Sequence, residues 1–235
     1  MKNELIHGDC LTVLPTLPAA SFDALITDPL YASDGVHASS RQQPPQAKYM
    51  QSGTPQLHAD FVGDEGDQRP HLAWMRLWLA ECSRVLKDGA PVLLFTDWRQ
   101  LPLTTDTLQC AGFTWRGVAV WDKTEGVRPQ LGRLRNQAEY VVWGSKGNMP
   151  PGRRAPVLPG VIRESVRKAG KHHMTGKPTN LMRQLVRICQ QRGHILDPFT
   201  GSGTTLVAAR EKGYGWTGIE MSPHYYAVAS MRISE

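Results

Sequence analysis

The sequence predicts an α/β protein with a doubly wound, mostly parallel sheet. Along most of the 235 residues, short apolar runs that suit buried strands alternate with longer stretches of helical spacing. Polar or glycine-rich turns follow several of the apolar runs. With 40% hydrophobic residues the chain can fill one large core, so we expect a single domain over residues 1–235.

The first half of the chain supplies three strands and two helices. Residues 23–27 form an apolar run that ends at Asp28-Pro29, as expected for a buried strand followed by a turn. Apolar residues recur at helical spacing over 71–87, and Gly89 supplies a stop just beyond. The other expected elements of this half are a strand at 91–96, a helix at 101–112 and a strand at 113–121.

The second half continues the alternation of strand and helix. A helix at its end is expected to begin at Pro223, because Ser222 is a good N-cap and proline suits the first helical position. The expected strands are 140–143, 194–196 and 215–219, and the expected helices are 178–191, 204–212 and 223–233.

Two segments have little periodicity. Residues 32–70 are rich in Ser, Gln, Pro, Gly and Asp, which indicates a long, mobile loop or lid. Residues 147–176 are rich in Pro, Gly and Arg, which indicates an insertion or small subdomain.

Composition narrows the class of protein. No apolar run reaches the about 18 residues of a membrane-spanning helix, and the N-terminus lacks the pattern of a signal peptide. We therefore expect a soluble, cytoplasmic protein. The four cysteines are far apart without a CxxC pair, and His172-His173 has no accompanying ligand cluster, so we expect neither disulfides nor a metal site.

The segment 195–205 (ILDPFTGSGTT) has the form of a strand end, a tight turn with two glycines and a helix start. Such a turn can bring backbone N–H groups close to a ligand, but it lacks the third glycine of a dinucleotide site. Glu220, at the end of the next strand, could accept two hydrogen bonds from a ribose diol. Asp197 could receive an ammonium group. A ligand with both a ribose and an amino acid moiety is S-adenosylmethionine.

The turn Asp28-Pro29-Leu30-Tyr31 follows the strand at 23–27, at the edge where a ligand should bind. An exocyclic base amine is a poor nucleophile because its lone pair is delocalised into the ring. If Asp28 and the Pro29 carbonyl accept its two hydrogens, the nitrogen can direct its lone pair at a sulfonium methyl group. Tyr31 would stack on a flipped base. Taken alone, the same four residues also suit an ordinary structural turn.

Together the two turns resemble the amino-methylating DNA methyltransferases, in which a (D/N/S)PP(Y/F/W) catalytic turn partners a DPFxGxGT cofactor turn. Asp28 precedes Asp197 by 169 residues, and this order resembles the β group of these enzymes. Other segments similar to the family in placement and residue type are 5–10 (LIHGDC), 121–123 (WDK), 135–139 (RNQAE) and 174–178 (MTGKP).

The resemblance implies a Rossmann-like methyltransferase fold with a small target-recognition insertion, S-adenosyl-L-methionine as cofactor, and direct methyl transfer to adenine N6 in double-stranded DNA. It implies Asp28, Pro29 and Tyr31 as catalytic residues. The cofactor-binding residues that it implies are Asp9, Cys10, Asp28, Lys177, Asp197, Phe199, Gly201, Ser202, Gly203, Thr204, Thr205 and Glu220. It also fits a bacterial or phage-borne protein, and leaves open a homodimer and a partner restriction endonuclease.

Charge locates the candidate DNA-binding region. The chain carries a net +6, but residues 123–192 alone hold 15 basic and 3 acidic residues, a net +12. Residues 147–176 are the candidate target-recognition region, because arginines there could meet phosphates and guanine edges; the alternative is a solvated basic surface. The candidate DNA-binding residues are Arg153, Arg154, Arg163, Arg167, Lys168 and Lys171.

One residue departs from the family pattern. Leu30 stands where the family has a second proline, which would fix φ and help to aim the Pro29 carbonyl. We favour retained catalysis with looser geometry, and a DNA-binding protein that has lost catalysis is an alternative. Cytosine N4 methylation is another, although an aspartate in the catalytic turn suggests adenine. Methylation of RNA or of a protein glutamine is disfavoured by the motif order.

Overall fold

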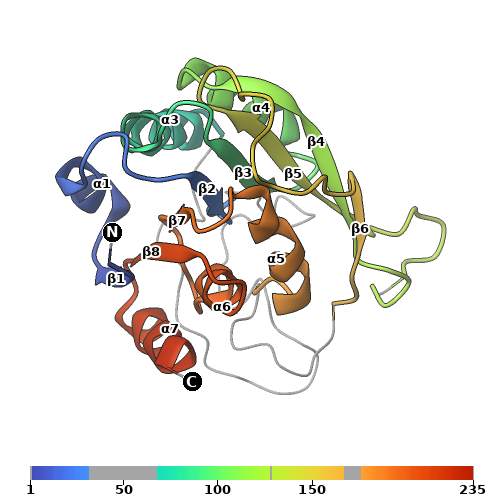
Figure 1. Cartoon of the computed structure of the whole chain (residues 1–235). Coiled ribbons are helices and arrows are strands. Elements are labelled where there is room, and N and C mark those ends of the chain that lie inside the picture. Colours follow the sequence, from blue (N-terminus) through green and yellow to red (C-terminus); the bar gives the residue numbers. More distant parts are fainter. Residues whose placement is uncertain (1, 32–67, 128, 167–175, 235) are drawn as a thin grey trace.

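The computed structural model describes residues 2–31, 68–127, 129–166 and 176–234 (Figure 1). Within these ranges eight strands form one sheet in the order β1-β8-β7-β2-β3-β5-β4-β6. The strands are β1 (Glu4–His7), β2 (Ala24–Thr27), β3 (Pro91–Thr96), β4 (Thr114–Asp122), β5 (Ala138–Ser145), β6 (Val161–Arg163), β7 (His194–Asp197) and β8 (Gly215–Glu220). Among these eight strands, only β5 runs antiparallel to its neighbours, β3 and β4. The expected doubly wound, mostly parallel sheet is confirmed.

Helices cover both faces of this sheet (Figure 1). They are α1 (Cys10–Val13), α3 (Gln68–Val85), α4 (Leu101–Cys110), α5 (Thr179–Leu185), α6 (Thr204–Glu211) and α7 (Pro223–Ser234), with 3-10 turns η1 (Leu14–Thr16) and η3 (Val186–Ile188). Alternate strand residues point to opposite faces. Leu25 and Leu94 pack with α3 and α4, whereas Ile26 and Phe95 pack with α5 and α6. Two cores therefore lie back to back across the sheet.

Several short elements escaped sequence-based prediction. Strand β1 has four residues, none of them buried, and β6 has three, of which only Ile162 is buried. Elements this short carry no usable periodicity. In the described part of the segment 147–176, β6 extends the main sheet beside β4.

Two helix boundaries also differ from expectation. Helix α3 begins at Gln68, within the segment expected to be a loop, and Pro70 lies in its first turn, where a missing N–H costs nothing. Most of that expected loop, residues 32–67, lies outside the described residues. The helix expected over 178–191 ends at Leu185, and the 3-10 turn η3 finishes it with Cys189 extended.

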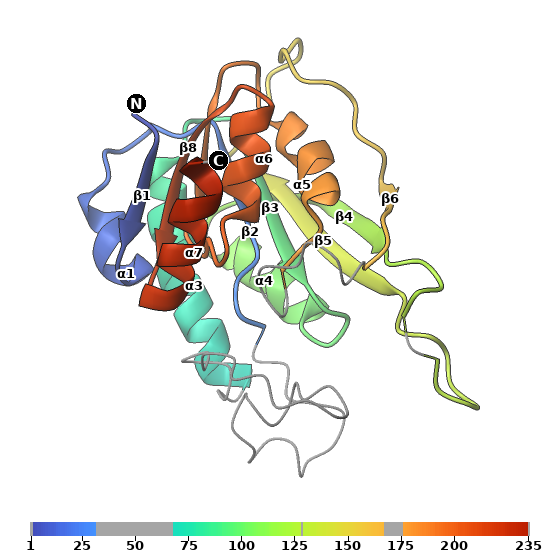
Figure 2. The same cartoon turned by 90° about the horizontal axis from the view of Figure 1, so that it is seen from below.

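The sheet reverses its winding between β2 and β7. From β2 the chain proceeds through α3 to β3 on one side, and from β7 through α6 to β8 on the other. Ligands of doubly wound folds bind at such a switch point, beside the carboxyl ends of the strands. Figure 2 shows the strands from another side, with β2 between the two halves of the sheet. The predicted catalytic and glycine-rich turns follow β2 and β7 directly.

Cys10, Cys82 and Cys189 are free and buried, and Cys110 is free and exposed. None of the helices in the described ranges combines the length and apolarity needed to cross a membrane. The described residues also bring together no group of three His, Cys, Asp or Glu side chains that could bind a metal.

Gly218 in β8 tests the packing around the glycine-rich turn. A Cβ at this position would lie 2.4 Å from Leu206 Cδ1 and 2.4 Å from Thr200 Oγ1. We expect Gly218→Ala to lower the free energy of unfolding by about 1–3 kcal/mol through overpacking, as measured by urea denaturation. Gly160→Ala is the control, since a Cβ there meets nothing within 4 Å. Equal stability of the two variants would contradict the packing described here.

Candidate active site

Four side chains from separate parts of the chain meet where β2 ends. Asp28 and Tyr31 belong to the turn after β2, Glu139 lies near the start of β5, and Lys177 precedes α5. Because β5 is antiparallel to β3, its first residues lie at the same edge as the carboxyl ends of the parallel strands, with Tyr140 opposite Thr96. The topology therefore assembles these residues.

The four side chains form one hydrogen-bonded cluster. The Lys177 ammonium donates to Asp28 Oδ2 at 2.7 Å, to Glu139 Oε1 at 2.8 Å and to Tyr31 Oη at 3.0 Å. The Tyr31 hydroxyl lies 2.6 Å from Asp28 Oδ1 and 2.9 Å from Glu139 Oε1, and donates its single proton to one of them. Lys123 approaches Glu139 Oε2 at 3.7 Å.

Burial and charge act in opposite directions on these groups. Burial raises the pKa of Asp28, and the Lys177 ammonium opposes that rise. Burial also acts to raise the pKa of Glu139, but Lys177 and Lys123 hold it below its ordinary value. The pKa of Lys177 is raised by the two carboxylates, against the effect of its burial. Burial and the neighbouring carboxylates raise the pKa of Tyr31, so its hydroxyl stays protonated.

The side chains of the cluster differ in their exposure to solvent. The Asp28 side chain is 27% exposed, whereas Glu139 is 14% and Lys177 only 8% exposed. Each Asp28 oxygen has one polar partner within the cluster, Tyr31 Oη for Oδ1 and Lys177 Nζ for Oδ2, and so keeps a lone pair for a further donor. Asp28 therefore presents an acceptor toward solvent, and Lys177 lies behind it.

Asp197 joins the two predicted turns but is closed to a ligand. Its Oδ1 accepts hydrogen bonds from Thr27 Oγ1 at 2.6 Å and from the Phe199 amide at 3.2 Å. The residue is 1% exposed, and burial raises its pKa to about 6. The expectation that Asp197 receives an ammonium group does not fit this placement, because its carboxylate is covered and ties β2 to the glycine-rich turn.

Glu220 organises the other side of the glycine-rich turn. Its two carboxylate oxygens accept from the Gly201 and Ser222 amides, each at 2.7 Å. The Gly8 amide donates to the Glu220 carbonyl, which brings Asp9 to the same edge. Asp9 caps α1 through the Leu11 amide, and Glu220 is only half-buried. Both carboxylates thus retain lone pairs at the rim of the sheet.

The glycine-rich turn is held by contacts behind it. Gly203 has φ of 84°, in the left-handed region, and a Cβ there would lie 3.1 Å from Ala229 Cβ of α7. Arg232 of α7 donates to the Ser202 and Thr204 hydroxyls at 3.1 and 3.2 Å. The hydroxyls of Ser202 and Thr204 therefore have a partner within the protein, and the cofactor-binding role expected of the two residues stays a prediction.

The remaining expected cofactor residues have mainly packing roles here. Phe199 packs against Trp78 of α3 at 4.9 Å between ring centroids, and against Trp74 at 5.3 Å. Cys10 is buried, and its pKa is raised to about 12 by burial and the Asp9 charge. Thr205 is also buried, within α6. Lys177 contacts the predicted catalytic residues rather than the glycine-rich turn.

The donor set at this edge fits a nucleoside-like cofactor in part. Glu220 offers acceptors suited to a ribose diol, Asp9 offers a further acceptor one strand away, and the left-handed backbone of the turn permits a close approach. Asp197 does not offer an open carboxylate for an amino acid tail.

The basic residues that the structure describes in and near the segment 147–176 lie at both edges of the sheet. Arg163 lies at the edge that holds the Asp28 cluster and pairs with Glu125 at 2.7 Å. Arg153 instead donates to the Ile188 carbonyl, and the Arg154 carbonyl accepts from Gln191, at the opposite edge of the sheet. The target-recognition role expected for residues 147–176 stays a prediction. Arg167, Lys168 and Lys171 lie outside the described residues.

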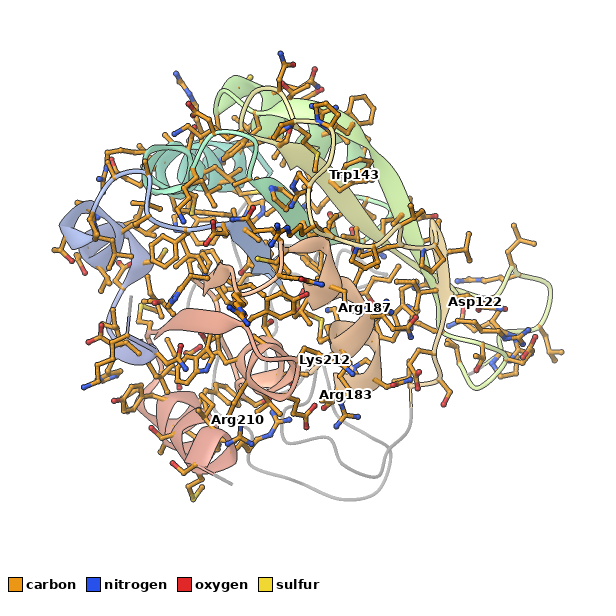
Figure 3. All side chains as sticks on the ribbon, viewed as in Figure 1. Asp122, Trp143, Arg183, Arg187, Arg210 and Lys212 are labelled. Atoms are coloured by element: carbon orange, nitrogen blue, oxygen red, sulfur yellow. The ribbon has the colours of Figure 1, made fainter. Side chains whose placement is uncertain are left out.

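Another group of basic residues lies on the side of the sheet that α5 and α6 cover. Figure 3 shows Arg183, Arg187 and Lys212 around α5 and the end of α6, away from Asp122 near β6. They line a depression of about 510 Å³, where Arg183 pairs with Glu211 at 2.6 Å. This depression contains none of the residues predicted to be functional.

Sequence reasoning missed three residues that the structure places at the site. Glu139 lies in the segment 135–139, which resembles the amino-methylating DNA methyltransferases, but a single acid at the start of an apolar strand does not by itself indicate a role. Thr27 ends a buried strand and reaches Asp197 across the sheet. Arg232 lies in the last helix, where its contact with the glycine-rich turn depends entirely on how α7 packs.

Comparison with known proteins identifies relatives of the whole chain. The sequence model of the N6/N4 DNA methylase family matches residues 22–153 and 158–231. The YubD protein of Escherichia coli (strain K12), whose name describes it as a methylase, is 28% identical over 233 residues, which cover 99% of this chain and 90% of YubD.

Two solved structures have a similar fold. The M1.HpyAVI–SAM complex superposes with a TM-score of 0.69 at 22% identity, over 99% of each chain. The PvuII DNA methyltransferase, described as cytosine-N4-specific, superposes with a TM-score of 0.71 at 17% identity, over 99% of this chain and 86% of that one.

Asp197 makes stability depend on pH. Its folded pKa of about 6 lies above the ordinary 3.8, so its contribution is fully present below about pH 4 and is lost as pH rises to about 6. Asparagine carries no charge to bury. We expect Asp197→Asn to become more stable relative to wild type by about 2–3 kcal/mol between about pH 4 and pH 7, measured by urea unfolding without ligand. A difference independent of pH would contradict the burial of an ionised Asp197.

Proposed function

The chain belongs to the N6/N4 DNA methylase family, and from this premise we propose that it transfers a methyl group from S-adenosyl-L-methionine to adenine N6 in double-stranded DNA. The observation that carries the proposal is the partly exposed Asp28 carboxylate at the switch point, one strand away from the glycine-rich turn and two strands away from Glu220. This arrangement supports the proposal of an amine acceptor beside a nucleoside-binding edge.

The residues around Asp28 supply orientation and proton acceptance. S-adenosyl-L-methionine, when bound, would supply a sulfonium methyl group: the amine nitrogen forms a bond to the methyl carbon, and the bond from that carbon to sulfur breaks, leaving its electron pair on sulfur. Asp28 accepts a hydrogen of the amine through a free lone pair, and the proton that nitrogen loses passes to this carboxylate. The Pro29 carbonyl accepts the second hydrogen. The ring of Tyr31, anchored through its hydroxyl, stacks on the flipped base.

Glu220, Asp9 and the backbone of residues 199–204 form the proposed cofactor site. Glu220 is already oriented by two backbone amides, so it can accept ribose hydroxyls without reorganisation. The Asp9 carboxylate lies near the base end of such a ligand. Asp197 contributes by holding the turn rather than by direct contact.

DNA is proposed to approach the edge that holds Asp28. The described parts of the connection between β4 and β5, residues 123–127 and 129–137, project there beyond the sheet (Figure 2). Leu131 and Leu134 in this connection are fully exposed, and Arg133 and Arg163 lie in or beside it. Basic residues that meet phosphates and exposed apolar side chains are both features of proteins that distort duplex DNA. The cytoplasmic location, the homodimer and the partner restriction endonuclease stay predictions.

The identity of the methylated base is the decisive test of this proposal. Purified protein incubated with unmethylated double-stranded DNA and labelled cofactor should yield N6-methyladenine on nucleoside analysis. Asp28→Ala should reduce transfer by at least about 100-fold, because the amine loses its acceptor. Labelled N4-methylcytosine would contradict the adenine assignment. DNA binding without any transfer would favour the alternative of a DNA-binding protein that has lost catalysis.

Leu30 provides a second test. A proline at this position would restrict the backbone and bias Pro29 toward an extended conformation, which helps to aim the Pro29 carbonyl. We therefore expect Leu30→Pro to leave the single-turnover rate of methyl transfer equal or raise it. A large fall in that rate, with unchanged thermal stability, would show that the Leu30 side chain has a role of its own.

A further inference from the structure

Lys177 places a cation directly behind the carboxylate that accepts the amine. Its ammonium lies 2.7 Å from Asp28 Oδ2 and 2.8 Å from Glu139 Oε1, and the side chain is 8% exposed. Its Nζ also lies 5.1 Å from the centroid of the Phe95 ring. An ammonium so far removed from water stays charged only because two carboxylates compensate its lost hydration.

Without Lys177, the cluster would hold two neighbouring carboxylates and no cation in contact with both. Asp28, in the turn after β2, and Glu139, in β5, approach the same nitrogen, so their charges would face each other if that nitrogen were absent. Two neighbouring carboxylates in a partly buried site cannot both ionise easily, and one takes up a proton. A protonated Asp28 would present a weaker acceptor to an amine and could not take its proton.

We propose that Lys177 is a positioning residue that keeps Asp28 ionised and correctly oriented for the amine, and that Glu139 holds Lys177 in place. The inference rests on the proposed methyl transfer. The Lys177 side chain is less exposed than that of Asp28, so Lys177 lies on the protein side of the carboxylate, and the lone pairs of Asp28 that point to solvent remain free. Lys177 therefore acts through Asp28 without touching the amine.

Within the described ranges, the titratable groups near Asp28 come from several packed elements. Lys177 and Glu139 contact the cluster from before α5 and from β5, and Tyr31 follows Asp28 in the same turn. Asp197 of β7 interacts with Asp28 by charge alone. Among these, Lys177 is the cation within hydrogen-bond distance of Asp28.

The pH dependence of single-turnover methyl transfer tests this role. In Lys177→Met, Asp28 loses an opposite charge, so its pKa rises and the acidic limb of the pH–rate profile should move up by about 1–3 pH units. On that limb the rate should fall about tenfold for each pH unit below the pKa of Asp28, because only the ionised carboxylate can accept the proton. Lys177→Arg keeps the charge, so its acidic limb should stay near that of wild type even if its maximal rate falls.

Lys123→Met is the matched control. This lysine also faces Glu139, at 3.7 Å, but makes no contact with Asp28. Its acidic limb should stay near that of wild type. The proposal would be overturned if the acidic limb of the pH–rate profile stayed fixed in Lys177→Met while the rate fell equally at every pH. It would also be overturned if the acidic limb moved equally in Lys177→Met and Lys123→Met.

Thermal unfolding supplies a readout that does not require activity. The difference in Tm between wild type and Lys177→Met should be largest near neutral pH and shrink on acidification, because protonated carboxylates no longer need the cation. A difference constant with pH would overturn the role of Lys177. If instead wild type transfers no methyl group to DNA while the difference still shrinks, the proposed function fails and the electrostatic role of Lys177 stands.

Discussion

The parallel pairing of β2 with β7 is the constraint on which the site depends. Leu25 pairs with Leu196, so the turns that follow these strands lie side by side although Asp28 and Asp197 are 169 residues apart. The Thr27–Asp197 hydrogen bond closes this junction at 2.6 Å. The sheet reverses its winding here, and in doubly wound folds ligands bind beside the carboxyl ends of the strands at such a switch point.

Polar groups at this edge are arranged so that almost every buried charge has a partner. Lys177 serves two carboxylates and a hydroxyl, Glu220 holds two backbone amides, and Asp197 holds a hydroxyl and an amide. Breaking one partner of such a network costs far more than an exposed pair contributes, because the remaining charge stays desolvated. The same networks fix the geometry before any ligand arrives, which is what orientation-based catalysis requires.

The fold carries the described basic residues of the central segment to different places. Arg163 lies at the edge that holds Asp28, Arg153 packs at the opposite edge, and Arg183 with Arg187 lines a depression beside α5. A count of charges along the chain cannot separate these destinations, because residues close in sequence diverge when a strand or helix carries them in opposite directions. Position relative to Asp28, rather than total charge, is therefore the better guide to DNA contact.

The sequence by itself determined the alternation of strands and helices, the two turns with Asp28 and Glu220, and the family, because apolar periodicity and turn chemistry are local properties. It could not reveal β1 and β6, which are too short to show a period, nor the covered state of Asp197. Only the tertiary structure decided that β5 runs antiparallel and carries Glu139 to Asp28, and that Lys177 completes the cluster. Such contacts arise from long-range packing and desolvation, which no local pattern encodes.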